Sequence, residues 1–313
     1  MGIASGARRP MSNDERNFDK ARRRFLAGLG MGTATAISQP AWGGETLEDA
    51  FADFFQKDYR RMSAEEIAAA LERIERKAKS RYDVEIDCQN TPPQPGVVFG
   101  YAINISRCKG YRDCVHACVK ENNLGRDSQM QYIRVLELDQ GDFNLEHSDH
   151  YYDPETVPVE GKHYLPVQCM QCDDPPCVKA CPVEATWMEP DGIVVVDYNW
   201  CIGCRYCMAA CPYWARHFNW TVPEIPAEEM NTNTHYLGNR PRPRGVVEKC
   251  HFCIHRTRKG QQPACMEACP TGSRIFGNLL DPDSEIRYVL ANKQVFRLKE
   301  DLGTEPKFWY FSD

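Results

Sequence analysis

Cysteine is the residue type most able to do chemistry in this chain of 313 residues, because it occurs sixteen times and recurs at fixed spacings. One group, CIGCRYCMAACP, begins at Cys201 and separates its four cysteines by two, two and three residues before a proline. Two further groups lengthen one of these gaps and keep the ending C-x3-C-P. Thiolates at this spacing are typical ligands of iron–sulfur clusters. The cysteines of these groups, called motifs 2, 3 and 4, are Cys169, Cys172, Cys177 and Cys181; Cys201, Cys204, Cys207 and Cys211; and Cys250, Cys253, Cys265 and Cys269.

Motif 1, RCKGYRDCVHAC at residues 107–118, is an incomplete copy of the same pattern. Cys108, Cys114 and Cys118 match the first, third and fourth cysteines, but Tyr111 stands where the second is expected. A phenol is a poor substitute for a thiolate, since its pKa is about 10 and its oxygen is a hard ligand. Three thiolates suit a three-iron cluster. The alternatives are a four-iron cluster that takes Cys88 or another residue as its fourth ligand, and a site without a cluster.

Cys88 stands outside the four motifs, just before a proline-rich stretch. For this residue alone, a buried thiol without a ligand role is the simpler interpretation. Zinc and disulfides are the other common uses of paired cysteines. Four repeats that end in C-x3-C favour iron–sulfur clusters over zinc, and disulfides would need neither the prolines nor the repeat.

The spacing also predicts the elements that position these thiols. A tight loop directs three thiolates at one cluster, while the last cysteine of each motif lies on a short helix and ligates the neighbouring cluster. The motifs must therefore work in pairs. TWMEPDGIVVVDYNWC, between motifs 2 and 3, reads as a β-hairpin with a Pro-Asp-Gly turn. Motifs 1 and 4 are each preceded by a predicted strand, in VVFGYAINISRC and GVVEKC.

The N-terminal segment RRRFLAGLGMGTATAIS places Arg22 and Arg23 just before an apolar stretch that ends at Ile37. This pattern is typical of a twin-arginine export signal, and the stretch is too short to span a bilayer unaided. The alternatives are an N-terminal membrane anchor and a basic disordered tail. We predict a signal at residues 1–43 and a periplasmic location. The twin-arginine route carries folded proteins, so a metal cofactor can be inserted before export.

Residues 44–96 are predicted to form a helical extension that ends in the linker TPPQPG. Apolar residues recur at helical spacing over 45–62, and a second helix begins at a capping box formed by Ser63 and Glu66. One face of that helix carries Ile67, Leu71, Ile74 and Ala78.

The chain has a net charge of −6. A nucleic-acid-binding protein is expected to carry an excess of basic residues, so the charge does not indicate a nucleic-acid partner.

These motifs identify residues 97–313 as resembling the four-cluster, ferredoxin-type electron-transfer subunits of the dimethyl sulfoxide and polysulfide reductase family. The resemblance implies an α+β fold of two paired bacterial-ferredoxin-like modules with small β-hairpins and short helices. Motifs 2 and 3, at about residues 164–222, would be nested between motifs 1 and 4. Within the family, the export signal, the N-terminal helices and the incomplete motif are most similar to the periplasmic subunits of Dsr-type membrane complexes in sulfur metabolism.

The resemblance also implies how the cysteines divide among cofactors. Three [4Fe–4S] clusters would be held by Cys169, Cys172, Cys177 and Cys211; by Cys201, Cys204, Cys207 and Cys181; and by Cys250, Cys253, Cys265 and Cys118. A fourth cluster, [3Fe–4S] or an atypically ligated [4Fe–4S], would be held by Cys108, Cys114 and Cys269. The implied partners are an NrfD-type membrane subunit that exchanges electrons with quinones and a periplasmic multihaem cytochrome c.

The function expected from these features is electron transfer without catalysis. The sequence has no convincing nucleotide loop, no nucleophile motif and no C-x-x-C-H haem attachment site. Motifs 2 to 4 use all their cysteines as ligands, which leaves an open metal position only at the incomplete site. The alternatives are a reductase of sulfur compounds that acts at an open iron there, and the electron-transfer subunit of a polysulfide- or tetrathionate-type molybdoenzyme.

Overall fold

The computed structural model describes residues 62–313. The predicted export signal, its boundary at residue 43 and the helix predicted over 45–62, apart from its last residue, lie outside the described residues. No helix in the described part is long and apolar enough to cross a membrane.

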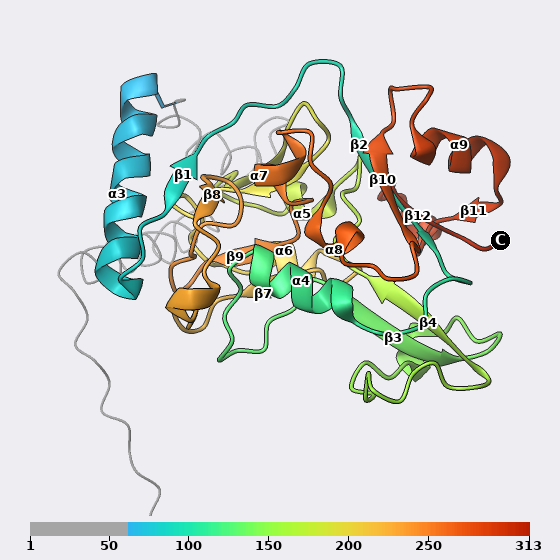
Figure 1. Ribbon diagram of the computed structural model, residues 1–313. Helices are drawn as coiled ribbons and strands as arrows, with labels where there is room; N and C mark the ends of the chain where they lie inside the picture. Colours follow the sequence, from blue (N-terminus) through green and yellow to red (C-terminus); the bar gives the residue numbers. More distant parts are fainter. Residues whose placement is uncertain (1–61) are drawn as a thin grey trace, which may run out of the picture. The chain divides into compact units, whose positions relative to one another are not determined.

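Short elements and long loops make up this part of the chain (Figure 1). The strands are β1 (Asp87–Gln89), β2 (Phe99–Asn104), β3 (Arg134–Asp139), β4 (Lys162–Val167), β5 (Thr186–Met188), β6 (Val194–Val196), β7 (Arg216–Phe218), β8 (Asn233–His235), β9 (Val247–Lys249), β10 (Arg274–Asn278), β11 (Val295–Phe296) and β12 (Phe308–Phe311). The α-helices are α3 (Ala64–Tyr82), α4 (Asp113–Glu121), α5 (Pro176–Lys179), α6 (Tyr206–Ala209), α7 (Ile254–Thr257), α8 (Ala264–Glu267) and α9 (Glu285–Asn292). Three 3-10 turns are η1 (Leu145–His147), η2 (Ala227–Glu229) and η3 (Glu300–Leu302).

The strands form one four-stranded sheet, in the order β10-β2-β12-β11, and four two-stranded sheets. β2 is antiparallel to β10 and parallel to β12. The small sheets pair β3 with β4, β5 with β6, β7 with β9, and β1 with β8, the last of these in parallel. This mixture of small sheets and short helices confirms the predicted α+β class.

The hairpin predicted between motifs 2 and 3 is confirmed. β5 and β6 pair in antiparallel register, with Thr186 opposite Val196, and the Gly192 amide donates to the Glu189 carbonyl oxygen at 2.9 Å to close the turn. The two strands predicted before motifs 1 and 4 are confirmed as β2 and β9, and every residue of both is buried. Each strand delivers the chain to the first cysteine of its motif.

Pairing between distant segments divides the described part into an outer and an inner set of elements. β2, which precedes motif 1, pairs with β10, which follows motif 4, and helices α4 and α8 pack together. Between them in sequence lie α5 and α6, which pack on each other beside the β5–β6 hairpin. β7 follows motif 3 and pairs with β9, which connects the inner elements to the outer ones.

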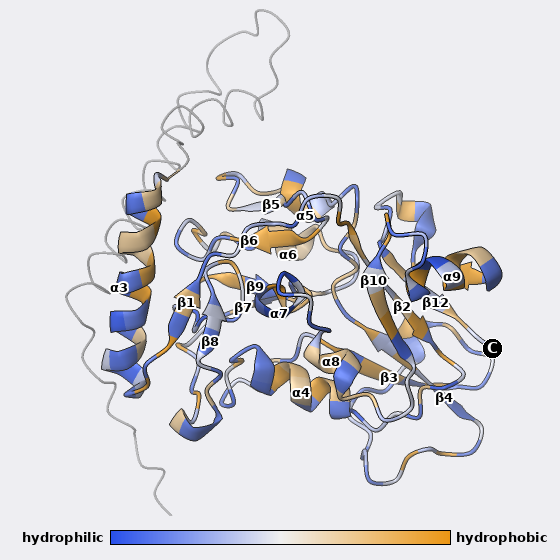
Figure 2. Cartoon of the chain, turned by 45° about the horizontal axis from the view of Figure 1, so that its top comes forward, coloured by the Kyte–Doolittle hydropathy of each residue, from blue (hydrophilic) through white to orange (hydrophobic). Residues whose placement is uncertain are grey.

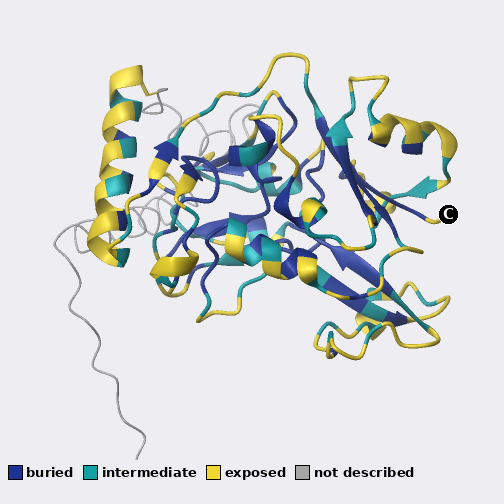
Figure 3. Cartoon of the chain, in the orientation of Figure 1, coloured by how far each residue is buried: buried dark blue, intermediate teal, exposed yellow. Residues whose placement is uncertain are grey.

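Helix α3 confirms the predicted capping box, because the Ser63 hydroxyl accepts from the Glu66 amide and the Glu66 carboxylate accepts from the Ser63 amide. Its apolar side faces β1, whereas its opposite side is hydrophilic and exposed (Figures 2 and 3). Ala70, Ile74 and Ala78 are its buried residues. The linker over 91–96 has no regular structure. The extension therefore packs on the main body through a narrow stripe.

The main core includes aromatic side chains of the four-stranded sheet β10-β2-β12-β11 and extends to the cysteine motifs. Tyr101 of β2 stacks on Phe308 of β12 with ring centroids 5.0 Å apart, and Phe276 of β10 lies 5.8 Å from the same ring. Aromatic contacts of this kind add to the stabilisation from apolar burial. They hold β2, β10 and β12 as a rigid support for the loops that carry motifs 1 and 4.

Candidate iron–sulfur sites

The four motif loops share one backbone feature. Two residues after the first cysteine of each motif, the chain adopts a positive φ, with values of 82° at Gly110, 47° at Gln171, 73° at Gly203 and 52° at Phe252. The next residue is Cys172 in motif 2, Cys204 in motif 3 and Cys253 in motif 4. In motif 1 it is Tyr111. The phenol therefore occupies the backbone position at which the other loops present a thiol.

A short helix follows each loop and carries the third cysteine. Cys114 lies on α4, Cys177 on α5, Cys207 on α6 and Cys265 on α8. In motifs 2 to 4 the helix ends two residues after the third cysteine, and one further residue separates it from the fourth cysteine. Motif 1 differs, because α4 continues to Glu121 and keeps Cys118 inside the helix.

The structure brings fifteen cysteines together in four sets, which are called sites 1 to 4. Each set combines cysteines of one motif with a cysteine of its partner motif, as the resemblance implies. Site 1 comprises Cys108, Cys114 and Cys269; site 2 comprises Cys118, Cys250, Cys253 and Cys265; site 3 comprises Cys169, Cys172, Cys177 and Cys211; and site 4 comprises Cys181, Cys201, Cys204 and Cys207.

The pKa shifts of the thiols reflect this grouping. Burial raises the pKa of Cys108 to about 11, and the charges of Cys114 and Cys269 add to the rise. Burial raises the pKa of Cys172 to about 12, with contributions from its three companions in site 3. The pKa of Cys207 is raised to about 11 by burial, and the charges of Cys201 and Cys181 contribute. Such thiols are protonated at neutral pH, so that the binding of iron must displace their protons.

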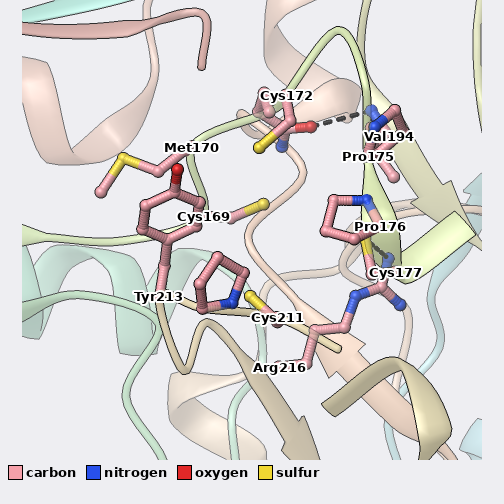
Figure 4. Close-up of a pocket in the computed structure, with 12 residues that line it drawn as sticks. Cys169, Met170, Cys172, Pro175, Pro176, Cys177, Val194, Cys211, Tyr213 and Arg216 are labelled. Atoms are coloured by element: carbon pink, nitrogen blue, oxygen red, sulfur yellow. Dashed lines mark hydrogen bonds between the residues drawn. The ribbon is translucent and has the colours of Figure 1, made fainter. Parts of the chain in front are cut away.

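At sites 1 and 3 the cysteine side chains surround small pockets instead of converging on a single metal position. In the part of the chain that the structure describes, no three His, Cys, Asp or Glu side chains are arranged to hold a single metal ion. At site 3 the four thiols surround a pocket that is also lined by Met170, Tyr213 and Arg216 (Figure 4). At site 1 the three thiols line a second pocket, together with Tyr111 and Arg274. Soft ligands spread around a small apolar space suit a cluster better than one ion.

Polar groups contact several of the cysteine sulfurs. At site 2 the Asn122 amide donates to the sulfurs of Cys118 at 3.4 Å and Cys253 at 3.7 Å, and the Tyr101 hydroxyl lies 3.3 Å from the Cys265 sulfur. At site 1 the Ser273 hydroxyl lies 3.2 Å from the sulfur of Cys269. Although burial opposes it, hydrogen bonding from Ser273 and Thr271 lowers the pKa of Cys269. Hydrogen bonds to sulfur are one of the ways in which proteins adjust cluster potentials.

Two buried arginines contact cysteine sulfurs from equivalent places. Arg216 donates to the Cys177 sulfur at 2.9 Å, and Arg274 donates to the Cys114 sulfur at 3.2 Å. Each begins a strand and stands five residues after the last cysteine of its motif. The Nε and Nη1 atoms of Arg216 are buried and have no hydrogen-bond partner among the described residues. Unsatisfied donors beside thiols fit a cluster, whose sulfides can accept these bonds. Neither arginine was predicted from the sequence, although their shared place after C-x3-C-P was a signal.

Cys88 lies apart from the four sites. It belongs to β1, which packs beside α3, and its amide donates to the Glu75 carboxylate at 3.0 Å. Burial raises the pKa of its thiol, and the other groups that shift it, among them Thr234 and Arg240, are not cysteines. This placement favours the interpretation of Cys88 as a buried thiol over its use as an extra ligand. Tyr111, in contrast, lies at the rim of site 1 and is 40% exposed.

The four sites adjoin one another in the order 1, 2, 3 and 4, and this order of neighbours is called the line. Helix α4, which carries Cys114 of site 1, packs on α8, which carries Cys265 of site 2. The Gln171 side chain, in the loop of site 3, donates to the carbonyl oxygen of Cys250 of site 2 at 2.8 Å. Arg216 donates to Cys177 of site 3 and begins β7, which packs beside α6, the helix that carries Cys207 of site 4. All four cysteines of site 2 are buried, whereas only Cys207 is buried at site 4. The line therefore passes through a fully buried site 2 and ends at the more exposed site 4.

Comparison with known proteins assigns the class. Residues 161–242 and 239–279 match the family model of the 4Fe-4S dicluster domain. The Hdr-like menaquinol oxidoreductase iron–sulfur subunit 1 of Archaeoglobus fulgidus is 42% identical over 212 residues, which cover 63% of this chain and 71% of the relative. The menaquinone reductase iron–sulfur cluster-binding subunit of Nitratidesulfovibrio vulgaris is 38% identical over 242 residues, covering 69% and 89%. The B polypeptide of polysulfide reductase from Wolinella succinogenes is 40% identical over 214 residues, covering 67% and 92%.

The protein belongs to the family of 4Fe–4S iron–sulfur subunits of oxidoreductases. Among its relatives it is similar to the iron–sulfur subunits of menaquinol, menaquinone and polysulfide oxidoreductases. Membership and the grouped cysteines together support multiple [4Fe–4S] clusters, which supply one-electron transfer when bound.

Proposed function

We propose that the protein is a periplasmic electron-transfer subunit in dissimilatory sulfur metabolism. It would relay electrons between an NrfD-type, quinone-interacting membrane subunit and a multihaem cytochrome c, as the DsrO-type subunit of a Dsr-type complex. The linear order of the four cysteine sites carries this proposal. Each site adjoins the next, so electrons need cross only short gaps within the protein. Two relatives named for menaquinol and menaquinone support a link to quinones.

We infer that sites 2, 3 and 4 hold [4Fe–4S] clusters and that site 1 holds a [3Fe–4S] cluster. Sites 2, 3 and 4 each offer four thiols, whereas site 1 offers three thiols and a tyrosine at its rim. The placement of Cys88 beside Thr234 removes the main reason to expect a rescued four-iron cluster. Residues of the chain hold the clusters and exclude water from the middle of the line.

The test is EPR spectroscopy with iron and sulfide analysis of the anaerobically purified protein. We expect iron and sulfide contents that match three four-iron clusters and one three-iron cluster. The oxidised protein should show the signal of the three-iron cluster, and reduction should replace it with signals of the four-iron clusters. A preparation that contains zinc in place of iron and sulfide would contradict the proposal.

A second measurement separates the relay from an enzyme. Reduced protein should pass its electrons to a multihaem cytochrome c but should not consume polysulfide or tetrathionate on its own. Turnover of either sulfur compound without partner subunits, together with a perturbed EPR signal of site 1, would instead favour a reductase that acts at an open iron.

A further inference from the structure

Three buried cations of this protein differ from the others in their partners. Seven lysine and arginine side chains are buried among the described residues. Four of them pair with carboxylates, namely Arg240 with Asp197, Arg242 with Glu248, Arg258 with Asp191, and Lys307 with Asp173. The remaining three have no carboxylate within ion-pair distance in the described part of the chain, and they are Arg274, Lys249 and Arg216.

Arg274 lies between sites 1 and 2. Its Nη2 donates to the Cys114 sulfur of site 1 at 3.2 Å. Its Nη1 donates to the Tyr101 hydroxyl at 3.3 Å, and this hydroxyl lies 3.3 Å from the Cys265 sulfur of site 2. The same Nη1 also donates to Gln168 at 3.1 Å. One guanidinium therefore reaches both sites, directly on one side and through a phenol on the other.

Arg216 has the equivalent position between sites 3 and 4. Its Nη2 donates to the Cys177 sulfur of site 3 at 2.9 Å (Figure 4). The same Nη2 also donates to the Thr186 hydroxyl at 2.9 Å. Arg216 begins β7, which packs beside α6, the helix that carries Cys207 of site 4, and its charge opposes the rise in the pKa of that thiol. Cys114, Cys265, Cys177 and Cys207, which lie on either side of the two arginines, are the third cysteines of the four motifs.

Lys249 lies in the middle gap, between sites 2 and 3. Its ammonium donates to the Cys250 carbonyl oxygen at 2.7 Å. It also lies 3.5 Å from the Gln171 side-chain oxygen, in the loop between Cys169 and Cys172 of site 3. Among the described residues Lys249 has no hydrogen bond to a sulfur, so it acts on the two sites through its charge alone.

A buried charge without an opposite charge costs several kcal/mol, even after the protein relaxes around it. A cluster held by thiolates carries net negative charge, which becomes larger when the cluster accepts an electron. A nearby cation in a medium of low dielectric therefore favours the reduced state. A cation that lies between two clusters does so for both.

We propose that Arg274, Lys249 and Arg216 set the reduction potentials of the four sites in adjoining pairs, with one cation in each gap of the line. They act as positioning charges and not as ligands. Each raises the potentials of both neighbouring clusters and offsets the repulsion between them when both are reduced. This inference rests on the proposed function, because it requires clusters in the sites.

The experiment is an EPR-monitored redox titration of the full-length protein, purified anaerobically, with Arg216→Gln, Arg216→Lys and a control. In Arg216→Gln we expect the equilibrium constant for reduction to fall about tenfold at site 3 and at site 4. This fall lowers each reduction potential by about 59 mV for a one-electron couple. Sites 1 and 2 should not change. Arg216→Lys should keep potentials near those of the wild type. The control, Lys179→Gln, removes an exposed charge beside Cys177 and should leave all four potentials unchanged.

Other outcomes decide the matter as well. If the wild type contains iron but Arg216→Gln shifts one site or none, the inference is wrong and the proposed function stands. A wild type without iron would instead overturn the proposed function. If Arg216→Gln loses iron, Lys249→Gln applies the same test to the middle gap, where no sulfur contact is removed. If the reduction potentials of sites 2 and 3 both fall, the inference is supported. If both variants lose iron, the cations have a structural role and the inference is overturned.

Discussion

Tyr111 shows how much one residue decides at an otherwise regular site. Its loop has the positive φ that the other three loops adopt two residues after their first cysteine, with Gly110 in the same left-handed conformation as Gly203. At the next position, however, the side chain is a phenol instead of a thiol. Because the phenol oxygen is a hard ligand of high pKa, iron at this position lacks a suitable donor.

Tyr111→Cys should therefore convert site 1 from a three-iron to a four-iron centre. The new thiol stands at the position of the second ligand and supplies the soft donor that the fourth iron needs. EPR of the oxidised protein should lose the three-iron signal, and iron analysis should show a gain. The matched control is Cys88→Ser, which should leave the wild-type signal in place. A three-iron signal that appears only when Cys88 is removed would make Cys88 the missing ligand.

The cysteines and Tyr111 could be predicted from the sequence because ligand spacing is a local property. The three buried cations could not, since arginine and lysine are usually exposed. Their placement emerges only when β7, β9 and β10 carry them beside residues of other motifs. Arg216 and Arg274 stand at the same distance after C-x3-C-P, which is a recognisable sequence pattern, whereas no pattern distinguishes Lys249.

At the scale of elements, the short helices decide which site receives each cysteine. α5 carries Cys177 toward site 3, yet Cys181, which follows this helix after one further residue, belongs to site 4 with Cys204 and Cys207. One turn of helix thus separates ligands of two sites.

Cys181→Ser should damage site 4 and spare site 3, although Cys181 belongs to motif 2. Loss of one thiolate should shift the potential of the site 4 cluster or reduce it to three irons. EPR redox titration measures this change. Cys177→Ser is the control from the same motif and should affect site 3 instead. The assignment fails if Cys181→Ser alters only site 3.

The β5–β6 hairpin, the strands before motifs 1 and 4 and the capping box of α3 were predictable, because each depends on residues close in sequence. The parallel pairing of β1 with β8 was not predicted, nor was the position of β12 beside β2. These contacts join segments more than a hundred residues apart. Their energy comes from burial against the finished core, which no local pattern displays.

At the scale of the whole molecule, the two modules are mutually dependent. β9 delivers Cys250 of the outer module and pairs with β7 of the inner one, and Lys249 at its end touches Gln171. Folding and cluster insertion are therefore expected to finish together. This matches an export route for folded proteins, which remains a prediction for residues 1–43.

Replacement of Arg22 and Arg23 by Lys should keep the protein in the cytoplasm with its clusters inserted. The twin-arginine route depends on this pair, whereas the folded part is untouched. Cell fractionation followed by iron analysis measures the outcome. The matched control replaces Arg8 and Arg9, an arginine pair that no apolar segment directly follows, and should not affect export. Normal periplasmic accumulation of the first variant would rule out the twin-arginine signal.

Because motifs 2 and 3 lie between motifs 1 and 4 in the sequence, the four sites receive their complete sets of ligands at different times during translation. A ribosome that has released the chain to residue 222 has delivered every ligand of sites 3 and 4, but only part of sites 1 and 2. β2, a wholly buried strand, then waits for β10 and β12 while the rest of the chain is translated. An unpaired hydrophobic strand is prone to aggregate. The nascent chain is therefore expected to need chaperone protection until residues 274–311 emerge.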